Sequence, residues 1–167
     1  TAQVLKIIIM NVVILLQNKY NETGGKKMFS NIVYLLLLTD QELSYDEYSQ
    51  DFCIGFFLTQ KQAEETARYY LKNIEGFCEY DCTYRIVEKV IADNPSQITP
   101  EWIWIVQGWN INEYFDETDI TESDCFVSHR RAKSVLHRMQ RTFQRTEWAL
   151  DHHKIGTLNW CEGFVRV

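Results

Sequence analysis

The residues best suited to hold a metal ion are the five cysteines and one pair of adjacent histidines. Cys78 and Cys82 are separated by three residues, which is a spacing that zinc ligands use. Cys125 and Cys161, with His152 and His153, could complete a tetrahedral site, but the chain lacks the second half of a zinc motif, such as another CxxC or HxxxH. The sequence therefore predicts no metal, and the odd number of cysteines favours reduced thiols over a disulfide framework.

Catalysis would need a nucleophile beside a base, or an acid with a raised pKa. The chain has no G-x-S-x-G turn and no glycine-rich loop before a helix. Glu162 lies between Trp160 and Phe164, and aromatic neighbours can raise the pKa of a carboxyl group. A hydrogen-bonded structural carboxylate is the simpler interpretation of Glu162, and His129 and His137 are interpreted as structural or solvated residues. The sequence therefore predicts no catalytic residue and no cofactor.

A strongly basic segment, residues 129–145, is the clearest indication of a binding surface. It contains no acidic residue, although the net charge of the chain is −6. At about 100° per residue on a helix, its basic side chains fall opposite the apolar Val135, Leu136, Met139 and Phe143, or flank them. The candidate binding residues are Arg130, Arg131, Lys133, Arg138, Arg141 and Arg145, together with Trp160 and Glu162. An ordinary solvated face, paired with the molecule's own acidic loops, is the alternative interpretation.

The first half of the chain predicts three strands and one helix. Apolar runs at 32–38 and 52–58 have the length of buried strands, and residues 84–91 alternate as a third strand. Between them, Thr59 and Gln62 form a capping box at the start of a helix that Gly76 ends. A loop with Pro95 and Pro100 then interrupts the chain.

The second half repeats this order. Residues 102–109 predict a strand, 110–124 a solvated acidic connection, and 125–127 lead to Ser128, an N-cap for the basic helix. Residues 147–155 and 160–167 predict closing strands. Thr59 and Ser128 stand at corresponding positions, 69 residues apart (128 − 59 = 69). We therefore predict an α+β fold of two tandem strand–strand–helix–strand repeats, 28–98 and 99–167, which form an antiparallel sheet with two helices packed on one side.

The first 27 residues are interpreted as a translated leader with Met28 as the native start. Codons for residues 23–28 can contain a bacterial ribosome-binding site followed by a start codon. The apolar run at 4–16 is shorter than the ~20 residues that span a bilayer, so the sequence predicts no membrane association.

Several short motifs resemble a small bacterial family of uncharacterised domains. They are Val33-Tyr34-Leu35-Leu36, Tyr45-Asp46-Glu47-Tyr48, Ile54-Gly55-Phe56-Phe57, Ile74-Glu75-Gly76-Phe77 and a final Trp160-Cys161-Glu162-Gly163-Phe164, of the form W-x-E-G-F. The first copy lacks the W-x-E-G-F ending, and the second copy lacks the I-G of the second strand. The family has no established activity, so the resemblance implies an α+β fold and a bacterial source, and no catalytic residue.

These observations together favour a cytoplasmic bacterial binding module without catalysis, of an inhibitor or immunity type, whose partner is another protein. The first alternative is a nucleic-acid-associated protein that uses the basic helix, which the net charge disfavours because phosphate binding needs a basic surface. The second alternative is an enzyme whose residues meet only in the folded chain. The sequence predicts no oligomeric state.

Overall fold

The computed structural model describes residues 31–42, 51–96, 98–111, 113 and 117–166. The predicted leader, residues 1–27, lies outside the described residues. The elements are β1 (Ile32–Asp40), β2 (Asp51–Phe57), α2 (Gln60–Asn73), β3 (Cys82–Val90), β4 (Trp102–Ile111), β5 (Glu117–Glu122), α3 (His129–Thr142) and β6 (Glu147–Lys154). In this part of the chain, no helix combines the length and apolar character needed to cross a bilayer.

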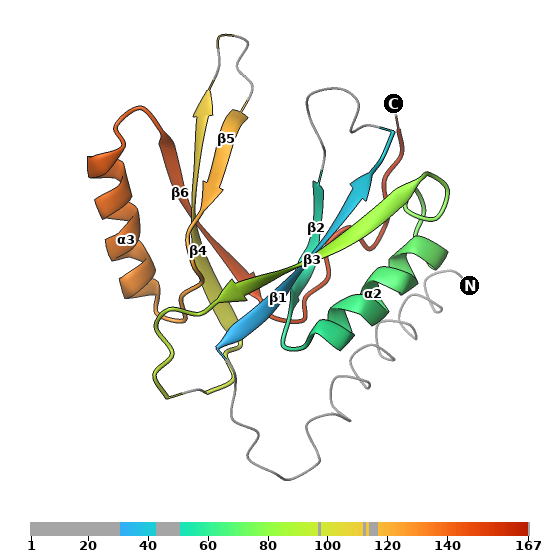
Figure 1. The fold of residues 1–167 in the computed structure, drawn as a ribbon, viewed down its shortest axis with the longest axis horizontal. Coiled ribbons are helices and arrows are strands. Elements are labelled where there is room, and N and C mark those ends of the chain that lie inside the picture. The colour runs from blue at the N-terminus through green and yellow to red at the C-terminus, as the bar shows by residue number, and fades with distance from the viewer. Residues whose placement is uncertain (1–30, 43–50, 97, 112, 114–116, 167) are drawn as a thin grey trace.

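The strands form two antiparallel three-stranded sheets, one in each half of the chain. Their orders are β2-β1-β3 and β5-β4-β6, so each sheet has the first strand of its half in the centre. The α+β class is confirmed, but the predicted single sheet with both helices on one side is wrong. Figure 1 shows the two sheets meeting near one end and diverging at the other, with α2 and α3 on their outer sides. We call β1, β2, α2 and β3 unit 1, and β4, β5, α3 and β6 unit 2.

Two sheets form because the central strand β1 is apolar on both faces. On one face Val33 and Leu35 pack with Ile103 of β4 in a core between the sheets. On the other face Leu36 packs with Ala67 of α2 in a second core. Burying one such aliphatic side chain stabilises the fold by about 1.5–3 kcal/mol, so neither face of β1 can be left in water.

Reciprocal hydrogen bonds join the two units. The Ala92 N–H, just after unit 1, donates to the Cys125 carbonyl of unit 2 at 2.9 Å. The Gly156 N–H, just after unit 2, donates to the Phe56 carbonyl of unit 1 at 2.8 Å. Each unit therefore continues past its last strand into a contact with the other. Descent of both units from one duplicated gene segment stays a prediction.

The second strand of unit 2 differs from the prediction. The structure places β5 at Glu117–Glu122, inside the stretch predicted to be a solvated connection. Residues 125–127 contribute only isolated bridges, in which Cys125 pairs with Ile91 and Phe126 with Trp104. The β-branched Ile120 and Thr121 favour a strand in spite of the surrounding acidic residues.

The predicted closing strand at 160–167 is wrong for the described residues. Residues 155–166, here called the C-terminal segment, form turns and irregular chain that lie along unit 1. Trp160 and Gly163 have φ angles of 58° and 77°, which no strand allows. Backbone bonds tie the segment to unit 1, from the Asn159 N–H to the Ile54 carbonyl at 2.9 Å and from the Phe164 N–H to the Glu75 carbonyl at 3.2 Å.

The end of the C-terminal segment is anchored by an ion pair and by aromatic packing. The Arg166 guanidinium donates from Nε to the carboxylate of Asp40 at 2.8 Å, and the Asp40 side chain is completely buried. The same guanidinium lies over the Tyr80 ring, 3.9 Å from its centroid. The Phe164 ring stacks on Phe52 at 4.6 Å. This segment therefore completes the core of unit 1.

Candidate functional site

The start of helix α3 is fixed by side chains from both units. The Ser128 hydroxyl accepts a bond from the Arg131 N–H at 3.3 Å, as predicted for its N-cap. The carboxylate of Asp93, which follows unit 1, accepts bonds from the N–H groups of Val127 at 2.7 Å and Ser128 at 3.1 Å. A carboxylate at this end also complements the positive pole of the helix dipole. The helix is therefore held in a defined orientation on unit 2.

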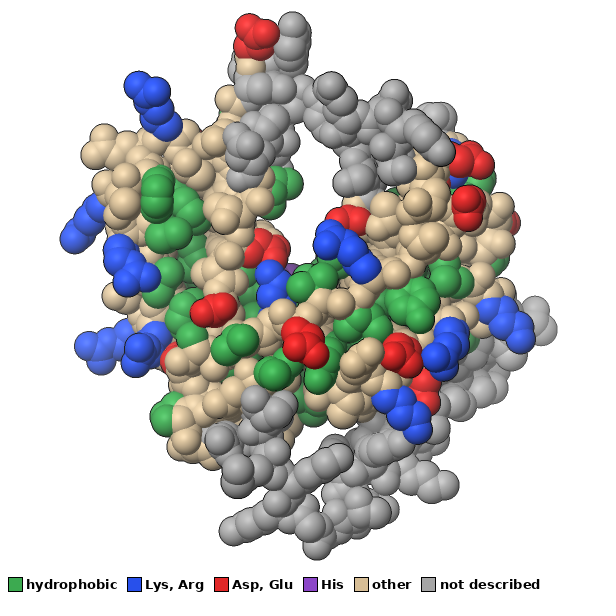
Figure 2. Space-filling model, viewed as in Figure 1, with side chains coloured by type: hydrophobic (Ala, Val, Ile, Leu, Met, Phe, Trp, Pro, Cys, Tyr) green, Lys and Arg blue, Asp and Glu red, His purple; other side chains and the backbone are tan. Residues whose placement is uncertain are grey.

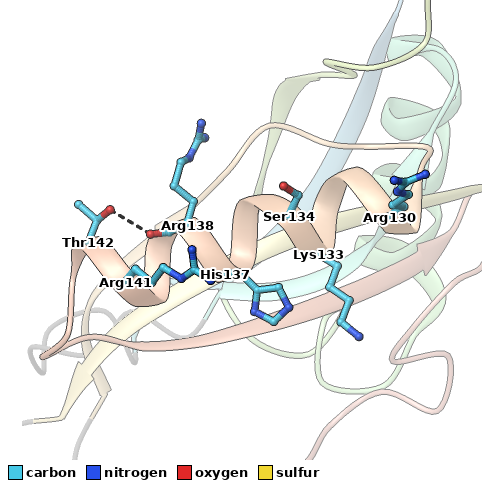
Figure 3. Close-up of a pocket in the computed structure, with 7 residues that line it drawn as sticks. All are labelled: Arg130, Lys133, Ser134, His137, Arg138, Arg141 and Thr142. Carbon is cyan, nitrogen blue, oxygen red and sulfur yellow. Dashed lines mark hydrogen bonds between the residues drawn. The ribbon is translucent and has the colours of Figure 1, made fainter.

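The outer face of α3 carries most of the predicted binding residues. A shallow, open depression of about 620 Å³ runs along this face. Figure 3 shows its lining side chains projecting from the single helix; they are Arg130, Lys133, Ser134, His137, Arg138, Arg141 and Thr142. In Figure 2, Lys and Arg side chains gather along the edge of the molecule that α3 forms. We call Arg130, Arg131, Lys133, Arg138 and Arg141, all exposed, the basic face.

Arg145 does not belong to the helix, contrary to the prediction. The structure ends α3 at Thr142, and the Phe143 N–H makes the last helical bond, to the Met139 carbonyl at 2.8 Å. Arg145 is exposed in the turn before β6. The charge of Arg145 therefore extends the basic face only beyond the end of the helix.

The basic face lacks the ion pairs that the other helix has. In α2, Lys61 lies 3.8 Å from Glu65, and Arg68 lies 3.2 Å from Glu64. No ion pair joins a residue of the basic face to another residue within the described ranges. Glu122 of the acidic stretch pairs instead with Lys89 of β3. Like charges one turn apart destabilise a helix by about 0.2–0.5 kcal/mol per pair, so α3 retains repulsion that a bound acidic group would relieve.

An apolar edge lies beside the C-terminal end of the basic face. Phe143 is 49% exposed, and its ring centroid lies 6.0 Å from that of Trp148 on β6. The Trp148 ring packs over Gly108, where an added Cβ would lie 2.5 Å from a ring atom. Positive charge and partly exposed aromatic surface therefore adjoin on the outer side of unit 2.

The two other predicted binding residues lie apart from the basic face, in the C-terminal segment. The Trp160 ring makes an edge contact with Phe52, with centroids 5.0 Å apart, and remains 48% exposed. Glu162 is exposed. The segment lies against unit 1, whereas α3 covers the outer side of unit 2 (Figure 1). The predicted residues therefore belong to two separate surfaces.

The histidines differ in their surroundings. His129, in the first turn of α3, packs on the Trp104 ring at 4.4 Å, and His137 lies on the basic face. His153 lies between the units, with its ring 4.7 Å from that of Phe56 and its Nε2 3.1 Å from the carboxylate of Asp151. Burial lowers the pKa of His153 below 6.5, against the opposite effect of Asp151. In the sequence, Asp151 and His153 are two residues apart within a strand, and this spacing could have indicated that their side chains lie on the same face of β6.

The thiols of Cys53, which is partly buried, and Cys125, which is buried, are poor nucleophiles. Burial raises the pKa of Cys53 to about 11 and that of Cys125 to about 12, so both stay protonated at neutral pH. Thiolate, and not thiol, binds zinc and attacks carbon. Within the described ranges, no group of three or more His, Cys, Asp or Glu side chains is arranged to hold a metal ion.

The exposed positive charge of α3 can attract an acidic surface. No family model, curated protein or solved structure matches the chain. The resemblance to the domains with a W-x-E-G-F ending therefore stays a prediction from the motifs.

Proposed function

We propose that this chain is a protein-binding module that docks the basic face of α3 on an acidic surface of a partner protein. The observation that carries the proposal is the concentration of exposed positive charge on one helix, without ion pairs to other described residues, in a chain of net charge −6. An inhibitor or immunity-type protein works in this way, because it covers its target and needs no reactive groups of its own. The five free thiols support a reducing, cytoplasmic setting.

A protein partner fits better than a nucleic acid. Interfaces between proteins are enriched in arginine and aromatic residues; the basic face contains four arginines, and Phe143, the first residue after α3, is 49% exposed. The net charge of −6 disfavours a nucleic acid, because the chain as a whole repels the phosphate backbone that the basic face would have to approach. Complementary charge also speeds association, which suits capture of a target.

The test is capture of partners from a nuclease-treated lysate of the source organism, followed by binding of the purified candidate. The variant Arg130→Ala/Arg138→Ala/Arg141→Ala removes three charges from the basic face. The matched control, Lys61→Ala/Arg68→Ala/Lys72→Ala, removes three charges from α2. We expect the wild type and the α2 variant to bind the same protein, and the α3 variant to lose at least about tenfold in affinity, or ~1.4 kcal/mol.

Two results would contradict the proposal. Equal loss of binding in both variants would show that net charge, and not the basic face, is responsible. Retention of nucleic acid in an untreated lysate, with loss of every partner after nuclease treatment, would support the nucleic-acid alternative, whose binding should also weaken steeply with salt.

A further inference from the structure

A small pocket at the junction of the two units differs in kind from the open basic face. It has a volume of about 230 Å³ and is lined from three strands and the C-terminal segment. Phe56 comes from β2, Trp102 from β4, His152 and Lys154 from β6, and Thr157 from the C-terminal segment. Binding sites for small molecules occur preferentially at such boundaries between structural units.

Backbone contacts hold the walls of this pocket in place without a ligand. The Gly156 N–H donates to the Phe56 carbonyl at 2.8 Å, and the Thr157 N–H donates to the Lys154 carbonyl at 3.2 Å. Gly55, also in the lining, allows the C-terminal segment to approach, because a Cβ at this position would lie 2.5 Å from the Thr157 carbonyl oxygen. The pocket is therefore preformed, which lowers the entropy loss on binding.

The lining combines aromatic rings with positive charge. The ring centroids of Trp102 and His152 are 5.5 Å apart, and Lys154 Nζ lies 5.7 Å from the centroid of the Trp102 ring. The described lining residues include no Asp or Glu. Lys154 pairs with Glu101 at 3.0 Å, but both side chains are about half exposed or more, and water screens such a pair so that it contributes little. A carboxylate that entered the pocket could replace Glu101 at little cost.

We propose that the junction pocket binds a small planar anion, specifically an aromatic carboxylate with a single ring. The exposed rings of Trp102 and His152 provide contact area for the ligand ring, and Lys154 provides its counter-charge; Phe56, only 2% exposed, contributes little area. The volume lies below the ~300–1,000 Å³ of pockets for drug-sized ligands, which excludes dinucleotides and other large cofactors. The proposal does not depend on α3 or on a protein partner.

The test is calorimetric titration of the full chain with benzoate, with benzamide as the neutral compound of the same shape. We expect saturable benzoate binding with a Kd of roughly 1 mM or tighter, and weaker binding of benzamide. Trp102→Leu and Lys154→Met should each weaken benzoate binding by about tenfold, because each removes one of the two recognition elements. Glu101→Gln should strengthen binding, since it frees Lys154.

Arg138→Ala/Arg141→Ala on the basic face is the matched control and should leave benzoate binding unchanged. Trp102 and Glu101 are exposed, so their variants should fold, and circular dichroism verifies this. The proposal is overturned if benzoate shows no saturable binding up to about 10 mM. Equal affinity for benzamide, or no effect of Trp102→Leu and Lys154→Met in folded protein, would also overturn it. None of these results bears on the basic face, so each proposal can fail alone.

Discussion

At the scale of single residues, the ion pair between Arg166 and Asp40 has the largest consequence for the fold. Asp40 is buried at the end of β1 with no exposed side-chain surface, and a buried charge is tolerated only when it is paired and hydrogen-bonded. Its partner lies 126 positions away, in the C-terminal segment. The pair therefore makes the stability of unit 1 depend on the last described residue of the chain.

Replacement of Arg166 by Met should destabilise the protein because it leaves the Asp40 carboxylate buried without its guanidinium partner. We expect a clear fall in Tm on thermal unfolding at pH 7. In the Asp40→Asn background, the same replacement should lower Tm by less, because the neutral asparagine side chain at position 40 needs no positive partner. Equal falls in Tm in the two backgrounds would show that Arg166 contributes only its contacts with Tyr80 and Glu42.

The junction residue His153 should make stability depend on pH. Burial lowers its pKa in the folded protein below 6.5, whereas the unfolded chain has the ordinary value. The unfolded state then binds more protons, so the free energy of unfolding falls as the pH drops below about 6.5 towards the folded-state pKa. His153→Gln should flatten the change in Tm between pH 7.5 and 5.5, and His137→Gln, an exposed control on α3, should not.

At the scale of elements, the two helices differ in their charged residues. α2 has acidic residues one turn from its basic ones, whereas α3 has no acid from His129 to Thr142. α2 also buries Ala63, Ala67 and Tyr70, whereas Ala132 is the buried residue of α3. α3 is therefore less supported by packing and by its own side chains than α2, as expected of an element that presents a surface.

Introduction of an acidic residue into α3 should raise the stability of the helix and lower the affinity for the proposed partner. Ser134 is exposed and lies four residues before Arg138 and four after Arg130. It also lines the depression on the outer face of α3. Ser134→Glu should stabilise the helix by about 0.2–0.5 kcal/mol for each pair that it forms, with Glu before Arg the better orientation. The same substitution should weaken partner binding, because it neutralises charge on the proposed contact. Ser134→Gln, without the charge, should leave both properties nearly unchanged.

At the scale of the whole molecule, local signals predicted most of the elements, though not β5, and long-range contacts decided how the elements are arranged. Thr59 caps α2 as predicted, because its hydroxyl accepts the Gln62 N–H three residues away. The basic face was also predictable, since a helical spacing places its charges together. The course of the C-terminal segment could not be predicted, because Phe164 packs on Phe52 and Phe77, which are distant from it in the sequence. The junction pocket was missed for the same reason.

Because the C-terminal segment closes unit 1, its removal should affect that unit first. Deletion of residues 158–167 would expose the aromatic surface around Phe52 and Phe77. It would also remove the Arg166 guanidinium from the buried Asp40 carboxylate. We expect amide hydrogen exchange to accelerate in β2 and in the C-terminal half of α2, with a smaller change in β5 and α3. The core shared by the two sheets, with Ile103 and Ile105 from unit 2, should still couple the units, so thermal unfolding should remain one transition at lower temperature. Faster exchange confined to unit 2, or no change in β2, would show that the segment only rests on the surface of unit 1.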